Sequence, residues 1–337
     1  MKYRKKFIIA SAVLIICFLF TLCVGRYHID IKTLLEIIRI KITNKSVPQN
    51  LYAAYTVLWS VRLPRALLSL IVGISLTLSG TVFQGLFKNP LVSPDILGVS
   101  SGASFGAACA ILFFGNSPIY IQISTFIFGL LAVYIASLIG KLSRNTTTTL
   151  VLSGIIVSSL FSAGLAFLKY IADPYEQLPA IVFWTMGGFN TASWNSFITA
   201  LLTMMPGLII IFLFRWRLNV LTLEDDEALS LGVDVKKARK VYIFAATLIA
   251  AGSISSCGII SWVGLVVPHM ARIIVGPDHK KLIPFCAVMG GCFMLIMDTI
   301  ARTISAGEIP ISIITSFIGA PFFAFLLVKQ SRNMWNE

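Results

Sequence analysis

The feature that most constrains this chain is a series of long apolar runs, separated by short segments that hold most of its charges. Nine runs are long enough for membrane-crossing helices, near 7–25, 63–83, 98–114, 119–140, 147–171, 193–214, 239–257, 281–304 and 310–328. A bilayer core of about 30 Å needs about 20 helical residues. A tenth run at 261–275 is shorter and predicts a tilted or partly re-entrant helix. Together they predict an all-α polytopic membrane protein with about ten transmembrane helices.

Composition supports the membrane assignment over a soluble fold. Hydrophobic residues make up 57% of the 337 and charged residues 12%, whereas soluble domains carry roughly 25% charged residues. The net charge of +13 would suit nucleic acid, but the basic residues lie in short clusters between apolar runs, which is typical of membrane topology. The six cysteines have no metal-ligand spacing and are interpreted as small buried hydrophobic residues.

The distribution of Lys and Arg predicts which side of the membrane each segment faces. Of the 27 basic residues, 18 lie in segments that are cytoplasmic if the N-terminus is inside. Ten crossings then put the C-terminus inside as well. The first run, with basic residues before it, resembles a signal peptide, but it is long enough to span and no cleavage site follows, so a retained helix is expected. The longest external segment is 26–60, and its amphipathic stretch 34–42 is interpreted as a helix on the outer surface.

Three arginines at the outer ends of predicted helices run against the positive-inside rule. Arg62 and Arg65 share a helix face at i and i+3, and Arg302 lies near the outer end of the 281–304 run. Such charges either dock acidic groups of an external protein or substrate, or snorkel to lipid head groups, and the spacing leaves both open. Asp298 lies four residues before Arg302 and is predicted to pair with it.

The largest cytoplasmic segment, 215–240, holds a short acidic stretch between basic ones. Five of the fourteen carboxylates lie in it, four of them at the start of a short predicted helix that Gly232 ends. This helix either fits the groove of a cytoplasmic partner or is a solvated loop helix. The residues considered for the partner contact are Glu224, Asp225, Asp226, Glu227, Ala228, Leu231 and Gly232.

Small polar residues recur in two of the runs. Ser158 and Ser162 lie in the 147–171 run, and Ser312 and Ser316 lie in the 310–328 run. Small residues at these spacings let membrane helices approach closely, and they also line polar pathways. The sequence leaves both roles open.

Several motifs of catalysis and energy coupling do not occur in the sequence. There is no GxxxxGK[ST] phosphate-binding loop, and no residues are spaced as a catalytic nucleophile with its base or as a set of metal ligands. The sequence has three histidines, and His269, beside Pro268, is interpreted as structural. Ion- or proton-coupled secondary transport would need more ionisable groups at mid-membrane depth, so it is disfavoured. The chain is therefore predicted not to be an enzyme, and either to depend on another subunit for energy or to act passively.

Five motifs occur in the order found in one family of permeases. They are Arg62–Arg65, Gly80–Ala103, Gly264–Arg272, Glu308–Ile311 and Gly319–Pro321, and they cover nearly the whole chain. This pattern resembles the FecCD-type permeases of iron–siderophore, haem and vitamin B12 importers. The resemblance implies a fold like that of the vitamin B12 importer permease, N-in and C-in, with one transmembrane domain over 1–337 in the bacterial cytoplasmic membrane. It implies ATP-driven import of a metal chelate, most often an iron–siderophore, with haem and cobalamin as alternatives.

The same resemblance implies a set of partners. The permease would form a homodimer, or occasionally a heterodimer, with a second permease subunit. It would bind two cytoplasmic P-loop ATPases and receive an extracytoplasmic substrate-binding protein. ATP and magnesium would be bound by the ATPases, with no cofactor in this chain and no nucleic-acid partner. Alternating access, driven from the ATPases, would be the mechanism.

Residue roles follow from the resemblance by position. Arg62, Arg65 and Arg302 would receive acidic residues of the binding protein, and 224–232 would be the coupling helix for the ATPase. The fifth and tenth helices would line the pathway. The gate and pathway residues would be Asn145, Thr146, Thr147, Ser158, Ser162, Ser312 and Ser316.

Overall fold

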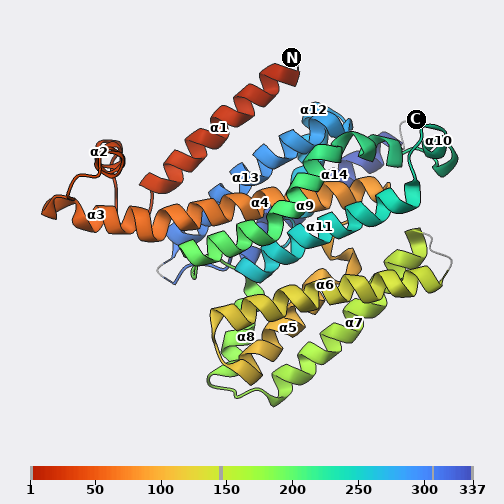
Figure 1. Cartoon of the computed structure of the whole chain (residues 1–337), viewed down its shortest axis with the longest axis horizontal. Coiled ribbons are helices and arrows are strands. Elements are labelled where there is room, and N and C mark those ends of the chain that lie inside the picture. The colour runs from red at the N-terminus through yellow and green to blue at the C-terminus, as the bar shows by residue number, and fades with distance from the viewer. Residues whose placement is uncertain (1–2, 144–146, 306, 335–337) are drawn as a thin grey trace.

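The structure is a computed structural model that describes residues 3–143, 147–305 and 307–334, and every regular element in these ranges is a helix (Figure 1). Seven helices are long and apolar enough to cross a membrane: α1 (Tyr3–Cys23), α4 (Leu63–Leu86, with the helical residues before it), α6 (Pro118–Leu142), α7 (Thr147–Ile171), α9 (Trp194–Leu221), α11 (Val235–Cys257) and α13 (His279–Ile304). Four further apolar helices are α5 (Val99–Phe114), α8 (Gln177–Met186), α12 (Val263–Val275) and α14 (Ile311–Met334), the last with side chains described to Phe325.

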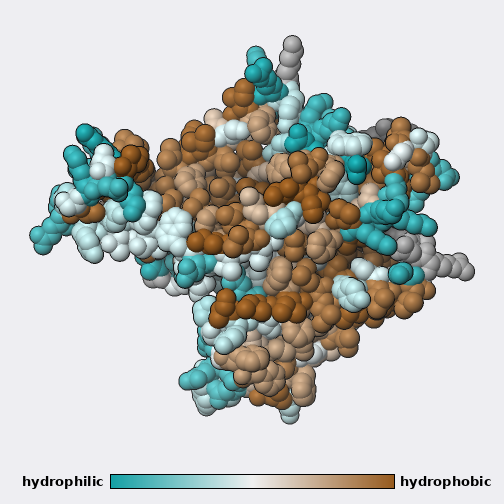
Figure 2. All heavy atoms as spheres, in the orientation of Figure 1, coloured by the Kyte–Doolittle hydropathy of each residue, from teal (hydrophilic) through white to brown (hydrophobic). Residues whose placement is uncertain are grey.

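Each of the ten predicted spans corresponds to one of these helices, which confirms the predicted all-α membrane fold. The helix that the sequence pattern did not predict is α8, whose 10 residues give a length of about 15 Å, half of a bilayer core. Apolar side chains cover much of the surface (Figure 2), including Ile16 and Leu160, which are 64% and 66% exposed. An apolar exterior of this extent requires lipid or further protein around it.

Helix α4 is the centre of the bundle, because α9, α11, α12 and α13 all pack on it. Two glycine crossings bring backbones into contact there. A Cβ at Gly73 would lie 2.3 Å from the Gly290 carbonyl oxygen, and one at Gly80 would lie 1.8 Å from that of Gly264. Any side chain at either position would push α13 or α12 away from α4.

Helical residues run continuously through the Arg62–Arg65 motif, from Gln49 to Leu86, and so precede Pro64. They comprise η1 (Gln49–Leu51), α3 (Tyr52–Thr56), a π-helical turn η2 (Val57–Arg62) and α4. A proline inside a helix lacks an N–H and crowds the carbonyl four residues earlier. The wider π turn directly before Pro64 relieves this crowding.

The segment before these turns folds onto the same end of the bundle. Helix α2 (Ile31–Ile42) starts at Asp30, whose side chain accepts a hydrogen bond from the Thr33 N–H. Leu34 and Ile37 on its apolar face belong to a buried cluster with side chains of α1, α3, α4 and α13, whereas Ile42 on its other face is 77% exposed. The prediction of an amphipathic helix is confirmed, and the helix begins three residues earlier than the predicted 34.

Three helix ends meet inside the apolar part of the bundle. Gly187 ends α8, Gly258 ends α11, and Ile311 begins α14. The Gly188 N–H donates to the Cys257 carbonyl at 2.8 Å, and the Ile311 N–H donates to the Gly187 carbonyl at 3.1 Å. Backbone groups freed by interrupted helices must find partners when no water is present. Here the three ends satisfy one another, and we call them the central junction.

Candidate functional site

The three predicted docking arginines come together at the predicted outer end, but they are buried. Arg62, Arg65 and Arg302 are 4%, 8% and 7% exposed. A Cβ at Gly25 would lie 2.5 Å from Nη2 of Arg62 and 3.3 Å from Nη1 of Arg302, so both guanidinium groups border this loop glycine. The predicted proximity of the three residues is thus correct, and the structure encloses them in protein rather than presenting them to solvent.

Backbone carbonyls hold two of these arginines. Arg62 Nη1 donates to the carbonyl oxygens of Leu22 and Cys23 at 2.6 and 2.9 Å. Arg302 Nη2 donates to the Thr21 carbonyl. These are the last carbonyls of α1, which have no partner within their own helix. Arg62 and Arg302 therefore cap α1 and fix its end to α4 and α13.

Arg65 makes the ion pairs of this cluster, and the predicted pairing of Asp298 with Arg302 is wrong. Arg65 Nη2 lies 2.8 Å from Asp298 Oδ1, and its Nε donates to both Asp298 oxygens at 3.0 and 3.1 Å. Helix periodicity correctly put Asp298 and Arg302 on one face, but Arg65 approaches from α4 with a two-pronged geometry that a neighbour one turn away does not provide. Asp298 is fully buried, so this pair is desolvated.

Glu308 gives Arg65 a second carboxylate, a role that the sequence pattern did not predict. Both Glu308 oxygens lie 3.1–3.2 Å from Arg65 Nη1, and the Glu308 side chain is 33% exposed. Its backbone has φ of +51°, a left-handed conformation that is unfavourable for a residue with a Cβ. The motif Glu308–Ile311 was the available signal, since it follows Arg302 by one short loop.

A cavity of about 550 Å³ lies between this arginine cluster and the central junction. Arg65 and Glu308 border one side of it, and Gly187, Gly258 and Ile311 border the other. It joins the ionic groups of the predicted outer end to the point where three helices are interrupted. The cavity therefore lies directly beside the three helix ends of the central junction.

A short acidic helix is present where the sequence predicted one, and its coupling role stays a prediction. Helix α10 (Asp225–Ser230) has Glu224 at its N-cap and ends at Gly232, whose φ is +77°. Leu229 and Leu231 are 58% and 61% exposed, whereas Ala228 is 1% exposed and packs into the core. Ala228 therefore anchors the helix, and Leu229, which was not among the predicted contact residues, joins Leu231 on the free face.

The acidic side chains of α10 are solvent-exposed, and one has an ion-pair partner. Asp225 Oδ1 lies 3.5 Å from Nη2 of Arg239 in α11. Glu224, Asp226 and Glu227 are exposed and make no ion pair with the described residues. The acidic helix that the sequence predicted therefore has an exposed surface that is both acidic and, at Leu229 and Leu231, apolar.

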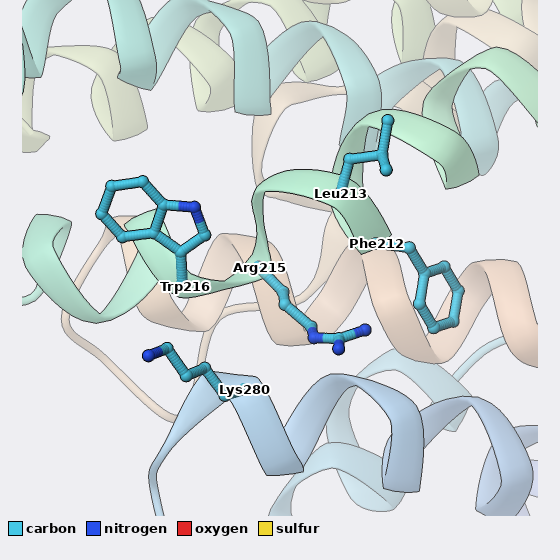
Figure 3. Close-up of a pocket in the computed structure, with 5 residues that line it drawn as sticks. All are labelled: Phe212, Leu213, Arg215, Trp216 and Lys280. Carbon is cyan, nitrogen blue, oxygen red and sulfur yellow. The ribbon is translucent and has the colours of Figure 1, made fainter.

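A separate pocket lies between α9 and α13 (Figure 3). The cavity has a volume of about 450 Å³ and is lined by Phe212, Leu213, Arg215, Trp216 and Lys280. Nearby, Asn219 of α9 donates to Asp278 at 2.8 Å and accepts from the His279 N–H at 2.8 Å. Although its partial burial favours the neutral acid, hydrogen bonds from Asn219, Lys280 and Lys281 lower the pKa of Asp278.

The small polar residues have mixed surroundings. Ser312 donates to the Ile259 carbonyl at 2.6 Å, which ties α14 to the central junction. Ser158 is half-buried against Gly98, whereas Ser162 is exposed and Ser316 is half-buried. The predicted gate residues Asn145 and Thr146 lie outside the described residues, as does the side chain of Thr147. A pathway role for these residues stays a prediction.

His269 packs on an aromatic ring, and the cysteines differ in burial: Cys257 and Cys286 are buried as predicted, whereas the other four are half-buried. The His269 ring lies 6.5 Å from the ring of Phe323, in an edge-to-face arrangement. Among the described residues no group of three or more His, Cys, Asp or Glu side chains is placed to hold a metal ion.

Known proteins resemble this chain over nearly its whole length. The model of the FecCD transport family matches residues 13–329. The molybdate import system permease protein MolB of Haemophilus influenzae is 40% identical, over 99% of this chain and 98% of its own. A "Probable iron chelatin transport system permease protein" of Helicobacter pylori is 38% identical, over 81% of this chain and 82% of its own. A solved structure described as an inward-facing metal-chelate type ABC transporter matches with a TM-score of 0.86 at 40% identity, over 97% of this chain and 99% of its own.

Together with the all-helical fold, these matches over nearly the whole chain define it as the permease subunit of an ABC importer. The chain belongs to the FecCD transport family. The family resemblance inferred from the five motifs is thereby confirmed.

Proposed function

We propose that this chain is one half of the channel of an ATP-driven importer in the bacterial cytoplasmic membrane, and that its cargo is a metal chelate, specifically an iron–siderophore. The observation that carries the proposal is the exposed, acidic α10 on a permease whose sequence has no nucleotide-binding loop. Energy for uphill import must then come from a subunit that binds α10. Names of relatives support the chelate class, since one 38% identical relative is named for iron chelatin.

The cytoplasmic partners in this proposal are two P-loop ATPases. Exposed Leu229 and Leu231 offer the apolar contact, and Glu224, Asp226 and Glu227 offer acidic ones to a basic groove rim. ATP and magnesium bind in those subunits, and this chain contributes no cofactor site. Because Ala228 and the Asp225–Arg239 pair fix α10 to the bundle, a push on α10 passes to α9 and α11.

The outer partner is an extracytoplasmic substrate-binding protein that presents acidic groups to the arginine cluster. In this structure the Arg65 guanidinium is paired with the carboxylates of Asp298 and Glu308. An incoming carboxylate would therefore replace that of Glu308, the more exposed of the two. That exchange is close to neutral in charge, because one carboxylate leaves the guanidinium as another arrives. Docking would then free the Glu308 loop, which borders the cavity at the central junction.

The second permease subunit completes the channel. Leu160, Ser162 and Phe167 on α7, and Phe317 on α14, are exposed on faces that this chain leaves uncovered. We place the homodimer contact and the pathway along these two helices. Alternating access then requires movement of α14 against the central junction.

A second cargo is supported by one specific comparison. The molybdate permease relative is 40% identical over nearly the full length of both chains. Molybdate, haem and cobalamin are therefore the alternatives to an iron–siderophore. In such importers the binding protein selects the cargo, so these alternatives differ in the partner more than in this chain.

Uptake by the reconstituted importer tests the proposal. The chain is assembled in proteoliposomes with the ATPase and binding protein encoded beside it, and internalised ferric siderophore, haemin, cobalamin and molybdate are measured with and without ATP. ATP-dependent accumulation of the ferric siderophore is expected. Uptake of molybdate alone would overturn the iron assignment, and gradient-driven uptake without any ATPase would overturn the importer class.

The Glu308→Gln variant tests docking without disturbing the buried pair. It weakens the hold on Arg65 and leaves Asp298 in place, so we expect tighter association of the binding protein and more stimulation of ATP hydrolysis by it. Glu36→Gln, a carboxylate on exposed α2, is the matched control. Unchanged binding-protein affinity in Glu308→Gln would contradict docking at Arg65.

A further inference from the structure

A groove between α6 and α11 opens at the predicted cytoplasmic end. The two helices approach closely where a Cβ on Gly129 would lie 3.5 Å from the Cβ of Ala251. A cavity of about 770 Å³ lies between them on the cytoplasmic side of that contact, with Leu86 and Phe87 from the end of α4 at its base. This size is within the range of roughly 300–1,000 Å³ typical of ligand pockets.

The walls of the groove are two matching stripes. On α6 the lining residues run from Leu130 to Lys141, and on α11 they run from Lys236 to Thr247, both with i, i+3, i+4, i+7, i+8 and i+11 spacing. Such spacing forms one continuous face of a helix. At 1.5 Å per residue each stripe is about 16 Å long, which is about half of a 30 Å hydrocarbon core. The groove is therefore one membrane leaflet deep.

Charge is confined to the mouth of the groove. Lys141, Lys236, Arg239 and Lys240 lie there, and the deeper lining is almost wholly apolar, with Tyr134 and Phe244 65% and 57% exposed at its sides. Figure 2 shows hydrophobic atoms along α6 and hydrophilic atoms gathered where α11 meets α10. Asp225 pairs with Arg239, and no other carboxylate of the described residues pairs with these four cations. The mouth thus has three positive charges in excess.

We propose that this groove binds one anionic phospholipid of the cytoplasmic leaflet. Its phosphate lies among Lys141, Lys236 and Lys240, and an acyl chain lies between the α6 and α11 stripes. A soluble anion would pair with the cations but make no contact with the apolar walls. A neutral lipid would pack against the walls but would leave the charge of the cations without a counter-charge. Since Arg239 belongs to the mouth and also pairs with Asp225, a bound phosphate competes with α10 for this guanidinium.

Lipid binding to the purified full-length permease tests this site. Delipidated protein is titrated with phosphatidylglycerol or phosphatidylcholine, and the number of bound lipids is counted by native mass spectrometry. We expect one phosphatidylglycerol to bind at least about tenfold more tightly than phosphatidylcholine, given roughly 1 kcal/mol per basic residue near an anionic lipid. Inorganic phosphate should not displace it. Equal affinity for the two lipids, or displacement by phosphate, would overturn the proposal.

Neighbouring residues provide matched controls for the charged mouth. Lys236→Gln with Lys240→Gln should reduce the preference for phosphatidylglycerol about tenfold. Lys5→Gln with Lys237→Gln removes the same charge at the same end, but neither residue lines the groove, and Lys237 pairs with Asp234. An equal loss in both double variants would mean a general surface charge effect and would overturn the site.

A groove-filling variant tests the apolar part. Ser137→Trp puts a large ring into the groove and leaves every cation in place, so both lipids should bind less. Leu131→Trp, on α6 but outside the groove lining, should bind as the natural chain does. The contrary outcome is a Ser137→Trp variant that binds lipid normally but no longer binds a second copy of the chain or the ATPase. The groove would then be a protein interface, and the lipid proposal would be wrong.

Discussion

The two ends of this permease use charge in opposite ways. At the predicted outer end, three arginines are almost fully buried and are held by the carboxylates of Asp298 and Glu308 and by the last carbonyls of α1. At the predicted cytoplasmic end, the acidic side chains of α10 are exposed, with one weak pair to Arg239. The first arrangement neutralises its charges within this chain, and the second leaves most of its carboxylates exposed and without an ion pair among the described residues. The difference teaches that charge type alone does not reveal whether a cluster is enclosed by its own chain or exposed.

Breaking the buried pair should have the largest effect. In Asp298→Ala, Arg65 keeps its charge in a desolvated site, so we expect a loss of about 3–5 kcal/mol in unfolding free energy. Thermal unfolding of the purified protein in detergent measures it. Arg65→Met combined with Asp298→Leu removes both charges and should recover much of the stability. A loss in Asp298→Ala no larger than that of an exposed pair would contradict the buried arrangement.

Charging the free face of α10 should affect binding and spare the fold. Leu229→Glu with Leu231→Glu should weaken ATPase co-purification at least about tenfold, because two exposed apolar contacts are lost from a small interface. The unfolding temperature should not change. Leu35→Glu, an equally exposed leucine of α2 at the other end, serves as the control. Normal co-purification of the double variant with the ATPase would show that α10 is not part of the interface.

The C-terminal stop of α10 should show a modest backbone effect. Gly232 has φ of +77°, and a Cβ added there would have no other atom within 4 Å, so Gly232→Ala suffers conformational strain alone. We expect about 1–2 kcal/mol of destabilisation, measured by thermal unfolding. Gly232→Asn should lose less, because asparagine tolerates the left-handed region better. Equal destabilisation by Gly232→Ala and Gly232→Asn would indicate that a contact is lost, and not that the backbone is strained.

Removing the exposed pair should have the smallest effect. Asp225 and Arg239 are 3.5 Å apart, with Asp225 59% exposed, so Asp225→Ala should change the unfolding free energy by less than about 1 kcal/mol. Thermal unfolding at low and high salt checks this, since an exposed pair is screened. A loss comparable to that of Asp298→Ala would erase the contrast between the two ends.

Most of the fold could be predicted from the sequence, because membrane-crossing helices must satisfy their backbones internally and so appear as apolar runs. Helix α8 was not predicted because its 10 residues are too few for such a run. Its hydrogen-bond partners at the central junction also come from segments far along the chain. Gly187–Gly188 and Gly258 were the available signals for interrupted helices.

In the candidate site, α10 could be predicted because acidic residues, helix and Gly232 are consecutive. The partner of Asp298 could not, since Arg302 on the same helix is the nearer choice in sequence and Arg65 is 233 residues away. The burial of the arginines could not be predicted either. Arg62 and Arg302 are buried by their hydrogen bonds to α1 carbonyls, and these bonds depend on how α1 packs against the bundle.

The sequence separation of Arg65 and Asp298 has a consequence for biosynthesis. A ribosome that adds about 5–20 residues per second needs roughly 10–50 seconds to make Asp298 after Arg65 has emerged. During that interval the translocon handles α4 with an arginine whose carboxylate does not yet exist. Arg65 lies near the end of α4, where a long side chain still reaches the lipid head groups. Final seating of α4 is therefore a late event of membrane insertion that waits for α13.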